Sequence, residues 1–180
     1  MMQSRRTARG AASSRTMVAN PGAVHAGAGH WTFTEMRPQD LRQVLAIERS
    51  SFANPWSSAL FLQELRIPFS RILVVRPAGG ADEPIVGYLC RWFVADEIHV
   101  LNVAVHLAHR GRGIGTLLVG EALREAKRRR ADAVTLEVRR SNEAGRRLYA
   151  SFGFHEVGVR RNYYGCGEDA LIMRLALPRG

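Results

Sequence analysis

Apolar positions recur with regular spacing from residue 31 onward, and this spacing predicts most of the secondary structure of the chain. Apolar residues three and four positions apart indicate amphipathic helices, whereas alternating or short continuous apolar runs indicate strands. The predicted helices span residues 38–50, 58–65, 114–130 and 142–152. The predicted strands span residues 32–37, 71–76, 85–93, 98–105, 133–139, 154–160 and 169–176. This order predicts one mixed α/β domain over residues 31–180.

Local details refine this pattern. The turn PAGGADEP (77–84) joins two apolar runs and predicts a β-hairpin. A serine at 57 or 58 is a suitable N-cap for the helix that follows it. In the helix 142–152, Ala144, Leu148 and Phe152 recur every fourth residue and are expected to face the core. Tyr149 lies beside that stripe on the surface of the predicted helix.

Residues 1–30 have a different composition from the rest of the chain. They consist mainly of Ala, Gly, Ser and Arg, with four arginines and no acidic residue. A segment with so few large apolar residues cannot bury a core, so it predicts a disordered basic tail. Its acid-free, Ser- and Arg-rich composition is also typical of an organelle transit peptide. We favour the alternative interpretation of a dispensable extension, or of translation that starts at Met17.

The charge of the chain restricts its partners only weakly. The chain holds 26 Lys and Arg against 16 Asp and Glu, a formal net charge of +10. This surplus favours an anionic ligand, although a solvated basic surface explains it equally well. No zinc-finger spacing or aromatic RNA-binding motif supports a nucleic-acid partner. No apolar run is long enough to span a membrane. Cys90 and Cys166 lack the spacing of metal ligands, so we expect no metal site and no disulfide framework.

A glycine-rich loop joins the predicted strand 98–105 to the predicted helix 114–130. Gly111, Gly113 and Gly115 alternate with other residues there, and Arg110 and Arg112 lie between or beside them. Glycine lets the backbone turn sharply, and the free N–H groups of a helix N-terminus attract anions. The loop lacks the GxxxxGK[ST] pattern of a P-loop, and Thr116 replaces the third glycine of a dinucleotide fingerprint. The sequence therefore predicts a site for a phosphate or pyrophosphate of another kind.

Two segments resemble the GCN5-related N-acetyltransferases (GNAT superfamily). They are LNVAVHLAHRGRGIGTLL (101–118) and LEVRRSNEAGRRLYASFGF (136–154). The resemblance implies a mixed sheet with splayed central strands, flanked by helices, and acetyl-CoA as co-substrate. It implies that the strand before the loop pairs with the pantetheine arm and that the loop amides hold the pyrophosphate. The positions that it assigns to acetyl-CoA are Val103, Ala104, Val105, Arg110, Gly111, Arg112, Gly113, Ile114, Gly115, Thr116 and Asn142.

The same resemblance assigns an acid and a base. From the alternating pattern alone, Glu137 would be a solvated or ion-paired carboxylate and Tyr149 a packing residue. The resemblance to LEVR and RLY motifs instead implies that Glu137 is the base and Tyr149 the acid of acetyl transfer. The acceptor amine must lose a proton, and the leaving thiolate gains one. His99 is the reserve candidate for the base, although a structural role is the simpler interpretation.

Three further segments resemble the ribosomal-protein-alanine (RimI-like) N-acetyltransferases, and VRRNYYGCGEDALIMRL (159–175) is the most specific of them. The resemblance implies a protein N-terminus as acceptor, bordered by Trp56, Asn162, Tyr163 and Tyr164; packing explains the aromatic residues equally well. Asp169 is either structural or attracts the substrate. We expect a cytoplasmic monomer, or an organellar protein if the tail is a transit peptide. The alternatives are acetylation of lysine side chains or small amines, and a basic module that binds the ribosome or RNA.

Overall fold

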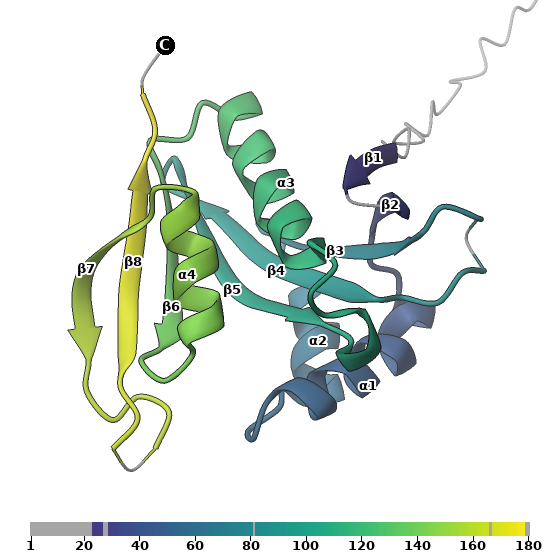
Figure 1. Cartoon of the computed structure of the whole chain (residues 1–180), viewed down its shortest axis with the longest axis horizontal. Coiled ribbons are helices and arrows are strands. Elements are labelled where there is room, and N and C mark those ends of the chain that lie inside the picture. Colours follow the sequence, from purple (N-terminus) through teal and green to yellow (C-terminus); the bar gives the residue numbers. More distant parts are fainter. Residues whose placement is uncertain (1–22, 27–28, 81, 166, 179–180) are drawn as a thin grey trace, which may run out of the picture.

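The computed structural model describes residues 23–26, 29–80, 82–165 and 167–178. Eight strands form one sheet in the order β1-β2-β3-β4-β5-β6-β8-β7 (Figure 1). The strands are β1 (Ala23–Ala26), β2 (Gly29–Glu35), β3 (Ser70–Pro77), β4 (Gly87–Val94), β5 (Glu97–Val105), β6 (Ala133–Arg139), β7 (His155–Arg160) and β8 (Ala170–Ala176). The helices are α1 (Leu41–Ser51), α2 (Ser58–Glu64), α3 (Ile114–Arg128) and α4 (Glu143–Ser151), with short 3-10 turns at Pro38–Asp40 and Leu107–His109.

Helices cover both faces of the sheet. Helices α1 and α2 bury Ile47 and Phe61 against one face, where they meet Tyr88 of β4. Helices α3 and α4 lie on the opposite face, where Leu118 packs with Leu89, the next residue along β4 (Figure 1). Successive side chains of a strand point to opposite faces, so β4 supplies both cores. The mixed α/β fold expected from the apolar spacing is confirmed.

The two central strands separate partway along their length. Strand β5 pairs in parallel with β6 from Glu97 opposite Ala133 to Val100 opposite Leu136. Against β4, the register changes at Leu101, which has no partner in the ladder and forms a β-bulge. A bulge bends its strand and increases the local twist. Beyond this point, residues of β5 and β6 line opposite sides of a cavity. The splayed central strands implied by the resemblance are therefore present.

Local predictions from the sequence are largely confirmed. The hairpin is formed by β3 and β4. Ser57 caps α2, because its hydroxyl accepts a hydrogen bond of 3.2 Å from the Leu60 N–H. On the exposed side of α3, Glu121 pairs with Arg124 at 2.5 Å, as expected for residues one helical turn apart. No helix among the described residues is long and apolar enough to cross a membrane.

The start of the ordered domain corrects one prediction. Disorder was predicted for residues 1–30; of these, 1–22 and 27–28 lie outside the described residues. Ala23–Ala26 form β1, which pairs antiparallel with β2, and β2 itself begins at Gly29. The prediction is therefore wrong for the end of this segment. An edge strand is held by backbone hydrogen bonds, which require no large apolar side chain, so hydrophobicity alone does not reveal it.

Helix α4 corrects the predicted apolar stripe. Ala144 is exposed, whereas Leu148 and Phe152 are half-buried and pack against the core as predicted. The buried residue of this helix is Tyr149, with 8% of its surface exposed. Its ring packs edge-on against Phe154, with centroids 6.0 Å apart. The nine-residue helix contacts the core mainly through its C-terminal half, and this places the tyrosine rather than the alanine at the centre of the contact.

Candidate active site

A cavity of about 380 Å³ lies where β5 and β6 diverge. Helix α1 and the loop after it border one side, and the loop between β7 and β8 borders the other. Residues far apart in sequence therefore meet in one concave space, as is usual for ligand sites. The residues that line it are Glu48, Phe52, Asn54, Trp56, Leu101, Asn102, Val103, Glu137, Val138, Arg139, Asn142, Tyr149, Tyr163, Tyr164 and Gly165.

Glu137 reaches this cavity because of the alternation in β6. Its neighbours Leu136 and Val138 are buried in the core, so the carboxylate points to the other face of the strand. The Glu137 side chain is 26% exposed, and its Oε1 lies 3.1 Å from a guanidinium nitrogen of Arg160. Burial together with the charge of Glu137 raises the pKa of the neighbouring Tyr163 phenol.

Tyr149 faces the same cavity from α4. Burial, with a smaller contribution from Tyr164, raises the pKa of the Tyr149 phenol to about 12. Desolvation disfavours the charged phenolate, so the hydroxyl keeps its proton at neutral pH. The structure thus brings Glu137 and Tyr149, proposed from the sequence resemblance, to one cavity.

A buried carboxylate that the sequence analysis did not single out also lines the cavity. Glu48 of α1 is 1% exposed and accepts hydrogen bonds from the Tyr88 hydroxyl, the Asn102 amide and the Trp56 backbone N–H. Burial and the charge of Glu48 raise the pKa of Tyr88, which therefore remains a donor. The signal was present in the sequence, because Glu48 continues the apolar stripe of Val44 and Leu45 in α1.

The glycine loop has the geometry of an anion-binding turn. Gly111 and Gly113 have φ angles of +74° and +77°, which residues with a Cβ rarely adopt. Gly113 is the N-cap of α3, so Ile114, Gly115 and Thr116 are its first three residues. Their N–H groups have no carbonyl acceptor within the helix. A Cβ at Gly115 would lie 3.3 Å from Leu148, so this glycine also allows α3 and α4 to pack closely.

The two loop arginines differ in their surroundings. Arg110 donates a hydrogen bond of 3.0 Å to the Val105 carbonyl and another of 3.0 Å to the Ser51 hydroxyl. Its side chain therefore ties the loop to β5 and to α1. Arg112 is exposed, and its charge contributes, after burial, to lowering the pKa of His109. Arg112 is thus the arginine whose side chain is available to an anion at the N-terminus of α3.

The strand before the loop offers an unpaired edge. Val103 lines the cavity, Ala104 is buried in the core, and Val105 is half-buried. All three pair with β4 on one side. On the other side, the β6 ladder ends at Val100, so the backbone groups of β5 that point toward β6 beyond Val100 lack partners in that strand. Such an edge can pair with an extended, amide-containing ligand.

Several predicted side chains have structural roles as well. Asn142 lines the cavity and caps α4, because its side-chain oxygen accepts a hydrogen bond of 2.9 Å from the Gly145 N–H. Trp56 lines the cavity and packs against Phe61 with ring centroids 5.4 Å apart. Tyr163 and Tyr164 line the cavity from the β7–β8 loop, and their ring centroids are 5.0 Å apart.

Asn162 does not line the cavity. It has a φ angle of +52°, and its side-chain oxygen accepts a hydrogen bond from the Gly167 N–H, so it shapes the β7–β8 turn. Asp169 accepts a hydrogen bond from the Asn162 N–H and lies 3.4 Å from Arg140, which gives this carboxylate a structural role. His99 lies outside the cavity lining, with its Nε2 3.7 Å from Glu97.

No cysteine is positioned as a nucleophile in the part of the chain that the structure describes. Cys90 is buried on the α1 side of β4, and burial raises the pKa of its thiol to about 12. A thiol with so high a pKa is a poor nucleophile. Cys166 lies outside the described residues. Among the described residues, no group of three or more His, Cys, Asp or Glu side chains is arranged to hold a metal ion.

Comparisons with known proteins agree with this geometry. Residues 41–154 match the acetyltransferase (GNAT) family. The chain is 39% identical over 140 residues to a Bacillus subtilis protein provisionally named a ribosomal protein bS18-alanine N-acetyltransferase, covering 77% of this chain and 90% of that protein. It is 32% identical over 149 residues to the ribosomal protein bS18-alanine N-acetyltransferase of Salmonella typhimurium, covering 81% and 97%.

A solved structure gives the same result for the fold. The crystal structure of the Escherichia coli ribosomal-protein alanine N-acetyltransferase superposes with a TM-score of 0.75 at 29% identity, covering 83% of this chain and 96% of that one. The matched family segment runs from α1 through α4 and therefore contains the glycine loop, Glu137 and Tyr149. The chain belongs to the GNAT family of acetyltransferases.

Proposed function

We propose that this acetyltransferase transfers the acetyl group of acetyl-CoA to the N-terminal α-amine of a protein, with the alanine of a small-subunit ribosomal protein as the foremost candidate. The observation that carries the proposal is the cavity between β5 and β6. There a carboxylate and a protonated phenol, Glu137 and Tyr149, face a space beside the free edge of β5. A ribosomal acceptor is consistent with a monomer that acts in the cytoplasm.

The chain offers acetyl-CoA two kinds of backbone contact. The free edge of β5 near Val103 suits the amides of the pantetheine arm. The first turn of α3 suits the pyrophosphate, because its N–H groups and the helix dipole favour negative charge. Within the described part of the chain, nothing lies within 4 Å of a Cβ placed at Gly111 or Gly113, so a phosphate group can come close to the backbone there.

A substitution at Gly113 tests this loop. Alanine must adopt a φ angle of +77° there, at a cost of about 1–2 kcal/mol. We expect Gly113→Ala to raise KM for acetyl-CoA and to lower Tm by about 2–8 °C. The control is Gly120→Ala inside α3, where a Cβ meets nothing within 4 Å and helix propensity favours alanine. Thermal unfolding and steady-state kinetics measure both effects; an unchanged KM in Gly113→Ala contradicts the proposed pyrophosphate site.

The proposed reaction is a direct displacement. The amine nitrogen forms a bond with the thioester carbonyl carbon, and the carbon–sulfur bond then breaks to release the coenzyme A thiolate. Glu137 accepts the proton that the nitrogen loses, directly or through a water molecule. In the structure, Arg160 forms an ion pair with Oε1 of Glu137. For Glu137 to accept the proton, this guanidinium must move away, or the other carboxylate oxygen must be the acceptor.

Tyr149 stabilises the leaving thiolate. Full proton transfer from a phenol with a pKa of about 12 to a thiolate whose conjugate thiol has an ordinary pKa of about 8.5 is uphill by about 5 kcal/mol. Tyr149 therefore acts mainly as a hydrogen-bond donor to the developing negative charge. We expect Tyr149→Phe to lower kcat about tenfold, the worth of one charge-assisted hydrogen bond. Because the phenol stays protonated below about pH 11, the ratio of wild-type kcat to Tyr149→Phe kcat should be the same at every pH from 6 to 10. A variant kcat equal to that of the wild type contradicts the role.

The acceptor follows from amine chemistry. An α-amine has a pKa of about 7.7–8.0, so roughly one-tenth of it is neutral near pH 7. A lysine amine, with a pKa of about 10.4, is neutral in only about one molecule in a few thousand. A single carboxylate base therefore suits an α-amine acceptor better than a lysine acceptor. Trp56, Tyr163 and Tyr164 provide aromatic walls for the first residues of a peptide. The names of the Bacillus and Salmonella relatives point to the same class of acceptor.

Intact-mass spectrometry of peptides incubated with the protein and acetyl-CoA tests this function. One peptide begins with alanine and copies a ribosomal N-terminus, a second has that N-terminus blocked, and a third has a lysine as its sole free amine. We expect a gain of one acetyl group on the first peptide alone. Acetylation of the third peptide alone would make the protein a lysine acetyltransferase. No product on any peptide would direct the search to small-molecule amines or to a ribosome-binding role.

A further inference from the structure

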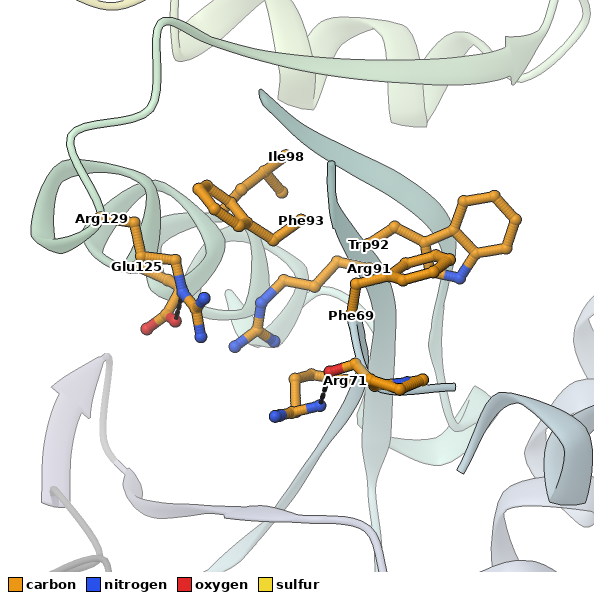
Figure 2. A pocket seen from close by; sticks show the side chains of 9 residues that line it. Phe69, Arg71, Arg91, Trp92, Phe93, Ile98, Glu125 and Arg129 are labelled. Atoms are coloured by element: carbon orange, nitrogen blue, oxygen red, sulfur yellow. Dashed lines mark hydrogen bonds and ion pairs between the residues drawn. The ribbon is translucent and has the colours of Figure 1, made fainter. Parts of the chain in front are cut away.

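A second cavity, of about 160 Å³, lies on the α3 face of the sheet and shares no lining residue with the first. It is formed by the end of β4, the segment before β3 and the last turns of α3 (Figure 2). The glycine loop stands at the opposite end of α3, so this cavity is separate from the proposed pyrophosphate site. Its lining combines three arginines with the aromatic rings of Phe69, Trp92 and Phe93.

Arg91 is the unusual residue of this cavity. Its position in β4 points it to the same face as Leu89, and it is only 7% exposed. Its Nη1 is buried and has no hydrogen-bond partner among the described residues. Figure 2 shows the guanidinium directed into the space between Arg129 and Arg71. Arg71 is also the residue directly opposite Arg91 in the β3–β4 ladder. Like charges in this arrangement destabilise a sheet, and a buried charge normally has a partner.

The nearby carboxylates are already engaged. Glu125, which lines the cavity, accepts a hydrogen bond from Arg129 on one oxygen and one of 2.6 Å from Arg128 on the other. Glu35 forms its ion pair with Arg71, whose Nε lies 3.5 Å from the Glu35 Oε1. The residues outside the described part of the chain include no Asp or Glu, so none of them can supply a carboxylate side chain. With Glu125 in the lining and Glu35 paired with Arg71, the three arginines of the cavity keep a surplus of one positive charge.

We propose that this cavity binds a small phosphate-class anion, either inorganic phosphate or the phosphate of a monoester. A phosphate group supplies acceptor oxygens and negative charge for the unpartnered Nη1 of Arg91, and guanidinium groups form paired hydrogen bonds with phosphate oxygens. Arg91 is buried at the base of the site, so a compact terminal group reaches it better than the backbone of a nucleic acid. Phe69, at the mouth, is 46% exposed and offers a ring to the organic part of a monoester. The rival occupant is water, for which a polar cavity of this size has room.

The test measures thermal unfolding against phosphate concentration with coenzyme A held at saturation, so that the glycine loop is already occupied. Chloride keeps the ionic strength constant. We expect Tm of the wild-type protein to rise saturably with phosphate. Arg91→Met should weaken phosphate binding about tenfold or more, as expected for the loss of a charge-assisted hydrogen bond. Without phosphate, it should be at least as stable as the wild type, because it removes an uncompensated buried charge.

Two controls define the site. Arg124→Met changes an exposed arginine of α3 that pairs with Glu121 outside the cavity, and it should keep the full phosphate response. If Arg91→Met fails to fold, Arg71→Gln at the half-exposed rim should show the loss instead. A wild-type Tm that does not respond to phosphate overturns the proposal and leaves water as the occupant. An equal response in wild type and both cavity variants also overturns it.

The source of the phosphate group is distinguished by calorimetry with adenosine 5′-monophosphate and adenosine, again with coenzyme A bound. Tighter binding of the monophosphate than of inorganic phosphate, with no binding of adenosine, supports a phosphate monoester that uses the ring of Phe69. Equal binding of the two phosphates supports inorganic phosphate. Adenosine that binds as well as its monophosphate overturns the proposal, because the arginines would then contribute nothing.

Discussion

Replacement of Glu137 by glutamine is expected to lower kcat about a hundredfold, with the affinity for acetyl-CoA nearly unchanged. Glutamine keeps the size of the side chain and its position on β6 but cannot accept the proton of the attacking amine. A hundredfold loss is at the low end of the rate enhancements that general acid–base catalysis provides, because an α-amine is already partly neutral near pH 7. The deficit should shrink as the pH rises above the pKa of the amine. Steady-state kinetics from pH 6 to 9 measure kcat, and calorimetry measures the affinity.

The matched control for this variant is Arg160→Gln. The ion pair between Arg160 and Glu137 is half-exposed, so its loss should change the free energy of unfolding by less than about 1 kcal/mol. Arg160→Gln removes that ion pair but keeps the carboxylate, so its kcat should equal or exceed that of the wild type. If both variants lose activity equally, the ion pair rather than the base explains the result. If Glu137→Gln retains full turnover, Glu137 has no part in the reaction.

Replacement of Glu48 by leucine is expected to destabilise the fold by about 3 kcal/mol. The carboxylate accepts from the Trp56 N–H at 2.7 Å, from Asn102 at 3.2 Å and from the Tyr88 hydroxyl. Leucine fills a similar volume but leaves these donors buried without an acceptor. For a protein of this size, Tm should fall by about 6–12 °C. Thermal and urea unfolding measure the change.

Glu143→Leu is the control for this substitution. Glu143 is 74% exposed at the side chain and pairs with Arg147 one helical turn away. Its replacement should change the free energy of unfolding by at most about 0.5 kcal/mol. Tyr88→Phe removes one donor of the network and should lie between the two variants, near 1 kcal/mol. If Glu48→Leu is as stable as the wild type, the carboxylate is not a structural centre of the α1 face.

The sequence predicted most elements and part of the candidate site because these depend on local spacing. The alternation in residues 133–139 places Glu137 opposite the core-facing residues of β6. The glycines at 111 and 113 are needed for positive φ angles at the start of α3. Family resemblance then implied the acid and the base. Both residues line one cavity in the structure, and their roles remain predictions for the kinetics.

Local spacing was insufficient where several elements meet. The periodicity of α4 predicted Ala144 in the core, yet Tyr149 is buried there, because the packing partners of a short helix decide which part of it is covered. The family resemblance, rather than local spacing, placed Asn162 beside the substrate; in the structure its side chain closes the β7–β8 turn. Strand β1 was missed because backbone pairing at a sheet edge needs no apolar side chains.

The sequence by itself determined the order of the elements, the phosphate-suited turn before α3 and the face of β6 that carries Glu137. Only the tertiary structure decided that β5 parts from β6 at Val100 and that Glu48 meets Asn102, 54 positions away. Only the tertiary structure buried the Nη1 of Arg91 without a hydrogen-bond partner among the described residues. The physical reason is that backbone preferences act over a few residues, whereas burial and charge pairing depend on chain segments that become neighbours only when the sheet and its helices assemble.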